Sequence, residues 1–320
     1  MVYILAASHS GSTLLAMLMG SHPEVCTVGE LKFTSLGEID NYRCSCRKEI
    51  RKCGFWNGIR QDMSKYGLTF DFACPDTHFN SITSQYICRL LRPLHRGPFL
   101  EKIRDMALNL SPQWRYHLPR IQKQNEILLK CLQIRTGKKV IVDSSKIGIR
   151  LKFLMRNPAL DVKIIRLMRD GRAVALTYMD PARFADAKDT SLQGGGTGGK
   201  RESERLSMTN AAYEWQRSNE EAEALLSNLA PSNWIEVRYE ELCLNTDREL
   251  KKIYALLGID NGKVYLDFRS QDHHIIGNGM RLDTTSEIKL DERWKSALSI
   301  ADLKKFEKVA GKMNRRLGYY

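Results

Sequence analysis

The chain has 320 residues, of which 42% are hydrophobic and 27% are charged, and its formal net charge is +13. It is long enough to bury a sizeable core, and no run of about 18 apolar residues occurs, which excludes a membrane-spanning helix. The basic balance favours an anionic partner such as a nucleotide, an acidic glycan or nucleic acid, but the basic residues are scattered and form no nucleic-acid-binding arm.

Short apolar runs alternate with helical patterns along much of the chain. The run Val2–Ala7 is too short for a signal peptide and lacks its basic flank, so it is predicted to be a buried strand. Three further strands are predicted at Val140–Val142, Val162–Leu167 and Trp234–Val237. Helices are predicted at Leu14–Gly20, Ile147–Arg156 and Ser203–Leu226. This alternation predicts an α/β fold of three layers, with a central parallel sheet covered by helices on both faces.

Residues 36–138 do not show the alternation. This segment carries aromatic residues, prolines and cysteines, with helical patterns at Thr83–Leu91 and Ile121–Cys131. We interpret it as a mainly helical, cysteine-containing insertion within a single domain that spans residues 1–320.

A candidate anion-binding loop follows the first predicted strand, in the sequence Ala7-Ser8-His9-Ser10-Gly11-Ser12-Thr13-Leu14-Leu15. A glycine here permits a tight turn, after which amides and hydroxyls at the start of a helix point at an anion. The alternative is an ordinary helix start capped by Ser or Thr.

A second glycine-rich segment, Gly194–Lys200, matches part of a Walker A pattern. The next residue is Arg201, so the Ser or Thr that would bind magnesium is missing, and no buried strand precedes the segment. We interpret it as a mobile loop.

Three of the eight cysteines are close in sequence, in Cys44-Ser45-Cys46 and Cys53. They could bind zinc with a fourth ligand elsewhere, form a disulfide, or be separate buried thiols, which is the usual case. The adjacent His273 and His274 are expected to be structural or exposed. Without a targeting signal, the cysteines are expected to be reduced and the protein cytoplasmic.

The first loop resembles the 5′-phosphosulfate loop of sulfotransferases that use 3′-phosphoadenosine 5′-phosphosulfate (PAPS). The resemblance continues through Ser21-His22-Pro23-Glu24-Val25 and Gly29-Glu30, and is strongest to the bacterial and tyrosylprotein sulfotransferases. Further family elements occur in order at Ile164–Thr177, Val237–Leu242 and Gly277–Arg281, followed by Lys289 and Trp294.

This resemblance implies a P-loop-like fold and sulfonate transfer from PAPS to a hydroxyl or amine, without a metal. In the family, an arginine at a strand end and a Ser or Thr eight residues later bind the 3′-phosphate, and Arg169 and Thr177 have that spacing. The donor-binding residues that it implies are His9, Ser10, Gly11, Ser12, Thr13, Leu14, Arg169, Thr177, Tyr239, Asn278, Arg281 and Lys289.

The resemblance also implies catalytic residues. Glu30 corresponds to the catalytic glutamate of the tyrosylprotein enzymes and is the candidate general base. The family usually has Lys or Arg at the position of His9, so the group that stabilises the leaving phosphate is either His9 or Lys146, which matches a family lysine.

Two other functions remain open at this point. One is a P-loop kinase, which the missing phosphate lysine and magnesium ligands disfavour. The other is a non-catalytic protein that binds polyanions, supported by the net charge alone. The acceptor is expected to be a small molecule, a glycan or a peptide, with no nucleic-acid partner and no membrane span, and the sequence indicates no oligomeric state.

Overall fold

A computed structural model describes residues 1–33, 36, 39–73, 75–79, 84–92, 97–185, 187, 189, 192–193, 204–262, 264, 266–270 and 273–320. The glycine-rich segment Gly194–Lys200 lies outside these residues. Among the described helices, none combines the length and the hydrophobicity that crossing a bilayer requires.

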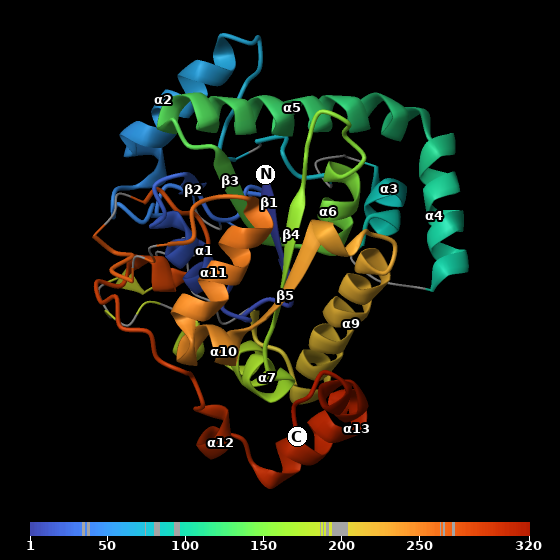
Figure 1. Cartoon of the computed structure of the whole chain (residues 1–320). Coiled ribbons are helices and arrows are strands. Elements are labelled where there is room, and N and C mark those ends of the chain that lie inside the picture. The colour runs from blue at the N-terminus through green and yellow to red at the C-terminus, as the bar shows by residue number, and fades with distance from the viewer. Residues whose placement is uncertain are drawn as a thin grey trace.

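A five-stranded parallel sheet forms the centre of the molecule, in the order β2-β3-β1-β4-β5 (Figure 1). The four predicted strands are confirmed as β1 (Val2–Ala6), β3 (Val140–Lys146), β4 (Lys163–Met168) and β5 (Trp234–Arg238). The three-residue strand β2 (Val25–Thr27) was not predicted, because so short a run shows no pattern of its own.

Helices cover both faces of the sheet, as the alternation predicted. Ile4 of β1 packs in a core that includes α1 (Ser12–Gly20) and α11 (Thr246–Leu257). The adjacent Tyr3 points to the opposite face and packs with residues of α6 (Gly148–Leu154) and α9 (Met208–Leu226). In Figure 1 the two helix pairs accordingly lie on opposite sides of β1 and β4. Successive side chains of a strand alternate between faces, so β1 is buried from both sides.

The segment between β2 and β3 is mainly helical, as expected. It contains α2 (Gly54–Ser64), α3 (Gln85–Leu90), α4 (Pro98–Leu110) and α5 (Pro112–Thr136). Figure 1 shows α5 crossing one end of the molecule above the sheet. Because Leu128 and Trp114 of α5 contribute to two of the cores, this segment is part of the packed fold.

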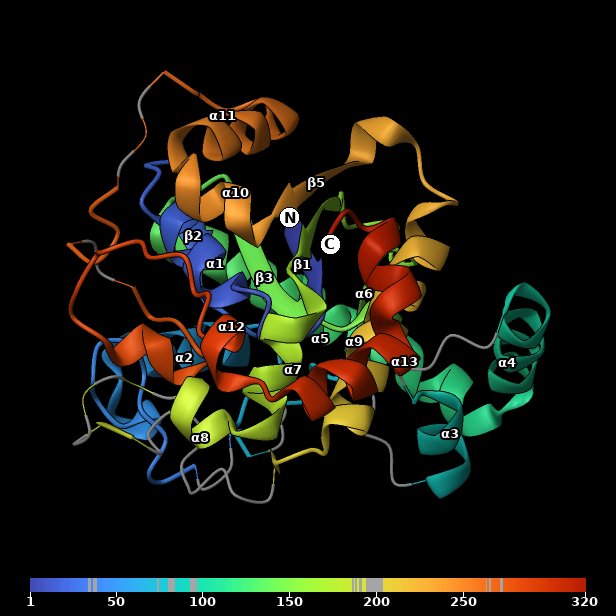
Figure 2. The same cartoon turned by 90° about the horizontal axis from the view of Figure 1, so that it is seen from below.

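The remaining helices follow β4 and β5. They are α7 (Gly171–Met179), α8 (Pro181–Phe184), α10 (Tyr239–Leu244), α12 (Trp294–Ala297) and α13 (Ile300–Arg316). Figure 2 shows α7, α12 and α13 gathered at one end of the sheet, beside the loop that joins β1 to α1. This is the carboxyl end of the strands, where parallel α/β sheets place their ligand sites.

Candidate functional site

The anion-binding loop connects β1 to α1 through two residues with positive φ. His9 has φ 64° and Gly11 has φ 91°. A Cβ atom at Gly11 would lie 2.4 Å from Cδ2 of Tyr239, so both the conformation and the close contact require glycine here. α1 begins at Ser12 without a side-chain cap, which leaves its first amides available to an anion.

Ser10 lies within this loop and is 1% exposed. Its hydroxyl has no hydrogen-bond partner among the described residues. A buried hydroxyl without a partner is costly, and a bound phosphate oxygen would remove that cost. The loop residues therefore fit an anionic ligand.

Arg169 follows β4 directly and is held by several contacts. Its Nη1 donates to the His9 carbonyl at 2.8 Å, and its Nη2 pairs with Asp291 Oδ2 at 2.9 Å. The guanidinium also lies 4.3 Å from the centre of the Tyr239 ring. Its Nε is buried without a hydrogen-bond partner in the described part of the chain, so one donor remains for a ligand.

Glu30 and Lys146 form an ion pair, with Glu30 Oε1 accepting a hydrogen bond from Lys146 Nζ. A second ammonium group, that of Lys32, lies 3.2 Å from Glu30 Oε2. Burial raises the pKa of Glu30, but the two lysines outweigh burial and lower this pKa to about 2. Burial also lowers the pKa of Lys146. Glu30 is thus an ionised carboxylate in a cluster of net positive charge.

The sheet explains how this pair meets. Glu30 follows β2, and Lys146 ends the neighbouring strand β3. Lys146 has φ 70° and pairs with Leu5 of β1 where the register between β1 and β3 shifts. The irregularity turns the end of β3 and is the kind of bulge that re-aims a side chain.

One cavity of about 920 Å³ collects most of the predicted site. It is lined by the predicted residues His9, Gly11, Ser12, Thr13, Leu14, Glu30, Lys146, Arg169, Thr177, Tyr239, Asn278 and Lys289. Residues more than two hundred positions apart in the chain therefore share a single hollow at the carboxyl end of the sheet.

The positions of the other predicted residues are more varied. Thr177 is buried, and its hydroxyl donates to the Ala173 carbonyl at 3.1 Å. The His9 ring packs edge-on against Tyr178, with the ring centres 4.8 Å apart. Asn278 accepts a hydrogen bond from the Met280 amide, and Lys289 is exposed and pairs with Glu287.

Arg281 does not line this cavity. It is 1% exposed, and its guanidinium donates to the backbone carbonyls of Gly277, Asn278 and Arg43. It also lies over the ring of Tyr42, 4.5 Å from the ring centre. In this structure Arg281 joins two loops and contacts the predicted donor-binding residue Asn278 through its backbone carbonyl, but it does not line the cavity.

Sequence reasoning missed Lys32 and Asp291. Lys32 lies two residues after Glu30, where a basic residue beside an acidic one could have signalled an ion pair. Asp291 pairs with Arg169 from a segment without regular structure, so no periodicity marks it. Burial raises the pKa of Asp291, but hydrogen bonds and charges from Arg293 and Arg169 hold it well below its ordinary value.

Comparisons with known proteins agree with this architecture. Residues 150–262 match the model of a family described as the sulfotransferase family. Mouse carbohydrate sulfotransferase 5 is 29% identical over 176 residues, which cover 52% of this chain and 44% of the mouse protein, so the match spans less than half the length of that relative.

Two solved structures share the fold at low sequence identity. The sulfotransferase domain from the curacin biosynthetic pathway has a TM-score of 0.51 and 17% identity, covering 100% of this chain and 97% of that one. The sulfotransferase domain from the Synechococcus PCC 7002 olefin synthase has a TM-score of 0.51 and 18% identity, with coverages of 98% and 94%. Residues 150–262 thus resemble the sulfotransferase family, and the fold of the chain resembles that of the two solved sulfotransferase domains.

Proposed function

We propose that this chain transfers a sulfonate group from PAPS to a hydroxyl or an amine of an acceptor. The observation that carries the proposal is the single cavity that collects the anion-binding loop, Arg169 and the Glu30–Lys146 pair. PAPS carries phosphates on both sides of its ribose and therefore needs two separate anion-binding sites. Transfer from it needs a base and a cation between donor and acceptor.

The donor would bind along the strand ends. The amides that open α1 and the Ser10 hydroxyl would hold the phosphosulfate, since that hydroxyl is buried without a partner in the described chain. Arg169 and Thr177 would hold the 3′-phosphate, because a guanidinium donates to a phosphate through a fork of N–H groups. Asp291 must release part of Arg169 when the phosphate arrives.

The chemistry is an in-line displacement at sulfur. Glu30 accepts the acceptor's proton while the new bond to sulfur forms and the bond between sulfur and the phosphate oxygen breaks. Lys146 moves toward that leaving oxygen, which gains negative charge, and His9 is the second candidate for this role. As Lys146 moves away, the pKa of Glu30 rises from its low value, which makes the carboxylate a better base when donor is present.

The chemical class of the acceptor is suggested by a relative's name and by the side chains of the cavity wall. The name of the mouse relative makes a carbohydrate hydroxyl the first acceptor to test. The cavity wall contains both basic and acidic side chains, among them Lys32, Arg183 and Glu287, so a polar acceptor suits it.

The test has a donor arm and a transfer arm. Calorimetry should show that the desulfated product, 3′-phosphoadenosine 5′-phosphate (PAP), binds without magnesium, and labelled PAPS should transfer its label to members of an acceptor panel. Preference for ATP with magnesium would instead support a kinase-like enzyme. Binding of polyanions that collapses with salt and ignores nucleotide would support a non-catalytic protein.

A further inference from the structure

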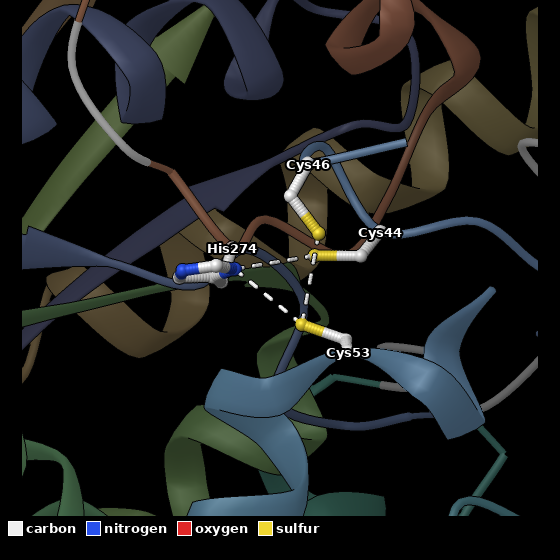
Figure 3. Close-up of side chains that lie close together, drawn as sticks. All are labelled: Cys44, Cys46, Cys53 and His274. Atoms are coloured by element: carbon white, nitrogen blue, oxygen red, sulfur yellow. Dashed lines mark hydrogen bonds between the residues drawn. The ribbon is translucent and has the colours of Figure 1, made fainter. Parts of the chain in front are cut away.

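Three cysteines and a histidine meet outside the cavity described above. The Sγ atoms of Cys44, Cys46 and Cys53 and a ring nitrogen of His274 all lie within 4.8 Å of one another. Figure 3 shows the three sulfurs and the His274 ring turned toward a common point. His274 comes from a segment more than two hundred residues away in the chain, so folding alone assembles this set.

Three of the distances within this group match the edges of a tetrahedron around a metal ion. The Sγ atoms of Cys46 and Cys53 are 3.7 Å apart, and His274 Nδ1 lies 3.7 Å from Cys44 Sγ and 3.4 Å from Cys53 Sγ. Two sulfurs about 2.3 Å from a tetrahedral Zn²⁺ are about 3.8 Å apart, and a sulfur–nitrogen pair is about 3.6 Å apart. A disulfide requires about 2.05 Å between its sulfurs, and all three cysteines are free thiols here.

The local backbone turns the first two thiols the same way. The Arg47 amide donates to the Cys44 carbonyl at 2.8 Å, and the Cys44 amide donates to the Lys48 carbonyl at 2.9 Å. Arg47 has φ 65°, which closes this turn directly after Cys46. The third thiol, Cys53, is the residue that precedes α2, and a helix N-terminus stabilises a thiolate.

His274 is held from both sides. The Trp56 indole donates to its carbonyl at 3.1 Å, and the Phe55 ring stacks on its imidazole with the centres 4.4 Å apart. Ser45 fastens the two segments together, because its hydroxyl donates to the His273 carbonyl at 2.6 Å and accepts from the Ile275 amide at 2.8 Å. The fourth ligand position is therefore built by the same residues that flank the cysteines.

We propose that Cys44, Cys46, Cys53 and His274 bind one structural Zn²⁺. Thiolates with an imidazole form a ligand set that selects zinc, and four protein ligands close the coordination shell, which suits a structural role and not catalysis. Cys44 and Cys53 are fully buried, while Cys46 and His274 are partly exposed and give the ion a route in. The sulfonate transfer proposed above uses no metal, so the two proposals are independent.

The zinc would also support one wall of the cavity. Two residues after His274, the Ile276 carbonyl accepts a hydrogen bond from the Glu30 amide at 2.9 Å. Gly29, with φ 84°, lies so close to this segment that a Cβ atom would overlap the Ile276 carbonyl oxygen. The ion would thus anchor the segment against which the candidate base is positioned.

The test is to measure zinc in the full-length protein, purified under reducing conditions and then incubated with Zn²⁺ alone. The zinc content, measured by elemental mass spectrometry, should be about one zinc ion per chain. Adding Zn²⁺ to protein from which a chelator has removed the metal should raise its melting temperature. Replacement by Co²⁺ should give the intense visible absorption bands of a tetrahedral thiolate site.

Variants at the partly exposed positions limit the risk of misfolding. Cys46→Ser and His274→Asn should each lose at least tenfold in zinc affinity, while Cys88→Ser, a partly buried thiol in α3, should keep the wild-type stoichiometry. The proposal is wrong if folded, reduced wild-type protein stays nearly zinc-free after incubation. It is also wrong if both ligand variants keep full zinc and the cobalt spectrum.

Discussion

Two glutamates in this molecule, one partly buried and one fully buried, have opposite electrostatics. Glu30, at the cavity, contacts the ammonium groups of Lys146 and Lys32, and its pKa is lowered to about 2 despite burial. Glu221, in α9, is 7% exposed, and its nearest cation, Arg217, is 3.9 Å away. Burial raises the pKa of Glu221 to about 7, against the opposing effect of Arg217.

The difference shows that burial of a carboxylate does not by itself mark a reactive site. Glu221 faces Gly148 at the start of α6, where a Cβ atom would lie 2.7 Å from its carboxyl carbon, and it does not line the cavity. Glu30 lines the cavity with two cations beside it. A candidate base differs from a packing residue in the charged groups that contact its carboxylate and in whether the carboxylate lines a cavity.

The largest expected effect is on turnover. Glu30→Gln keeps the shape of the side chain but removes the base, so single-turnover transfer from saturating PAPS should slow by about 10² to 10⁴-fold. PAP affinity should stay nearly unchanged. Glu126→Gln, which neutralises an ion-paired carboxylate on α5, is the matched control and should keep wild-type rates.

Two outcomes would contradict the role of Glu30. A loss of less than tenfold would point to His9 or to another base at the cavity. Joint loss of PAP affinity and rate would mean that Glu30 shapes the donor loop and takes no proton.

For Glu221, the second glutamate of the comparison, the Glu221→Gln variant tests the raised pKa through the free energy of unfolding. The folded state holds a proton on Glu221 up to about pH 7, whereas the unfolded chain releases it near its ordinary pKa of about 4.5. The contribution of this group to stability is therefore fully present below pH 4.5 and is lost as the pH rises toward 7.

The amide variant needs no proton, so at pH 8 it should be more stable than the wild type by up to about 3 kcal/mol. Near pH 4.5 this gain should vanish. Urea unfolding of both proteins at the two pH values measures it, and a difference that does not change with pH would show that folding does not shift the pKa of Glu221.

Arg169→Ala should weaken PAP binding by roughly 30- to 150-fold, corresponding to about 2–3 kcal/mol for a lost charge-assisted contact. Arg166→Ala is the matched control, because Arg166 lies in β4, which Arg169 directly follows, but pairs with Glu223 and Glu236, away from the cavity. The control should lose stability and keep PAP affinity. Unchanged calorimetric affinity of Arg169→Ala would remove this residue from the donor site.

The smallest expected effect concerns Asp291. Asp291→Asn removes the carboxylate that pairs with Arg169, so PAP should bind about two- to fivefold more tightly, the size of a partly exposed ion pair. Calorimetry at fixed ionic strength measures the change. Weaker binding would show that Asp291 holds the cavity wall in place more than it competes with the donor.

The sequence predicted the sheet well, but it did not indicate where Arg281 lies. Strands β1, β3, β4 and β5 follow from apolar runs. Arg169 and Lys146 were implied by the family resemblance, and both line the cavity. Arg281 lies in a segment with little regular structure, so spacing alone could not tell a cavity-lining arginine from one that joins two loops.

Long-range contacts also escaped prediction. The Glu30–Lys146 ion pair depends on β2 lying beside β3, and β2 is too short to be recognised. His274 was expected to be structural or exposed, and nothing local to Cys44 or Cys53 indicates that it lies beside them. Each of these contacts joins residues more than a hundred positions apart, where no periodic pattern connects the two partners.

The central position of β1 has a consequence for how the chain folds. Val2 pairs with Val142 on one side and with Lys163 on the other. The middle strand of the sheet therefore pairs with strands that follow it in the chain by well over a hundred residues. Such high contact order slows folding and leaves an apolar strand with two unpaired edges during synthesis. During that interval the unpaired edges of β1 make the chain prone to aggregation.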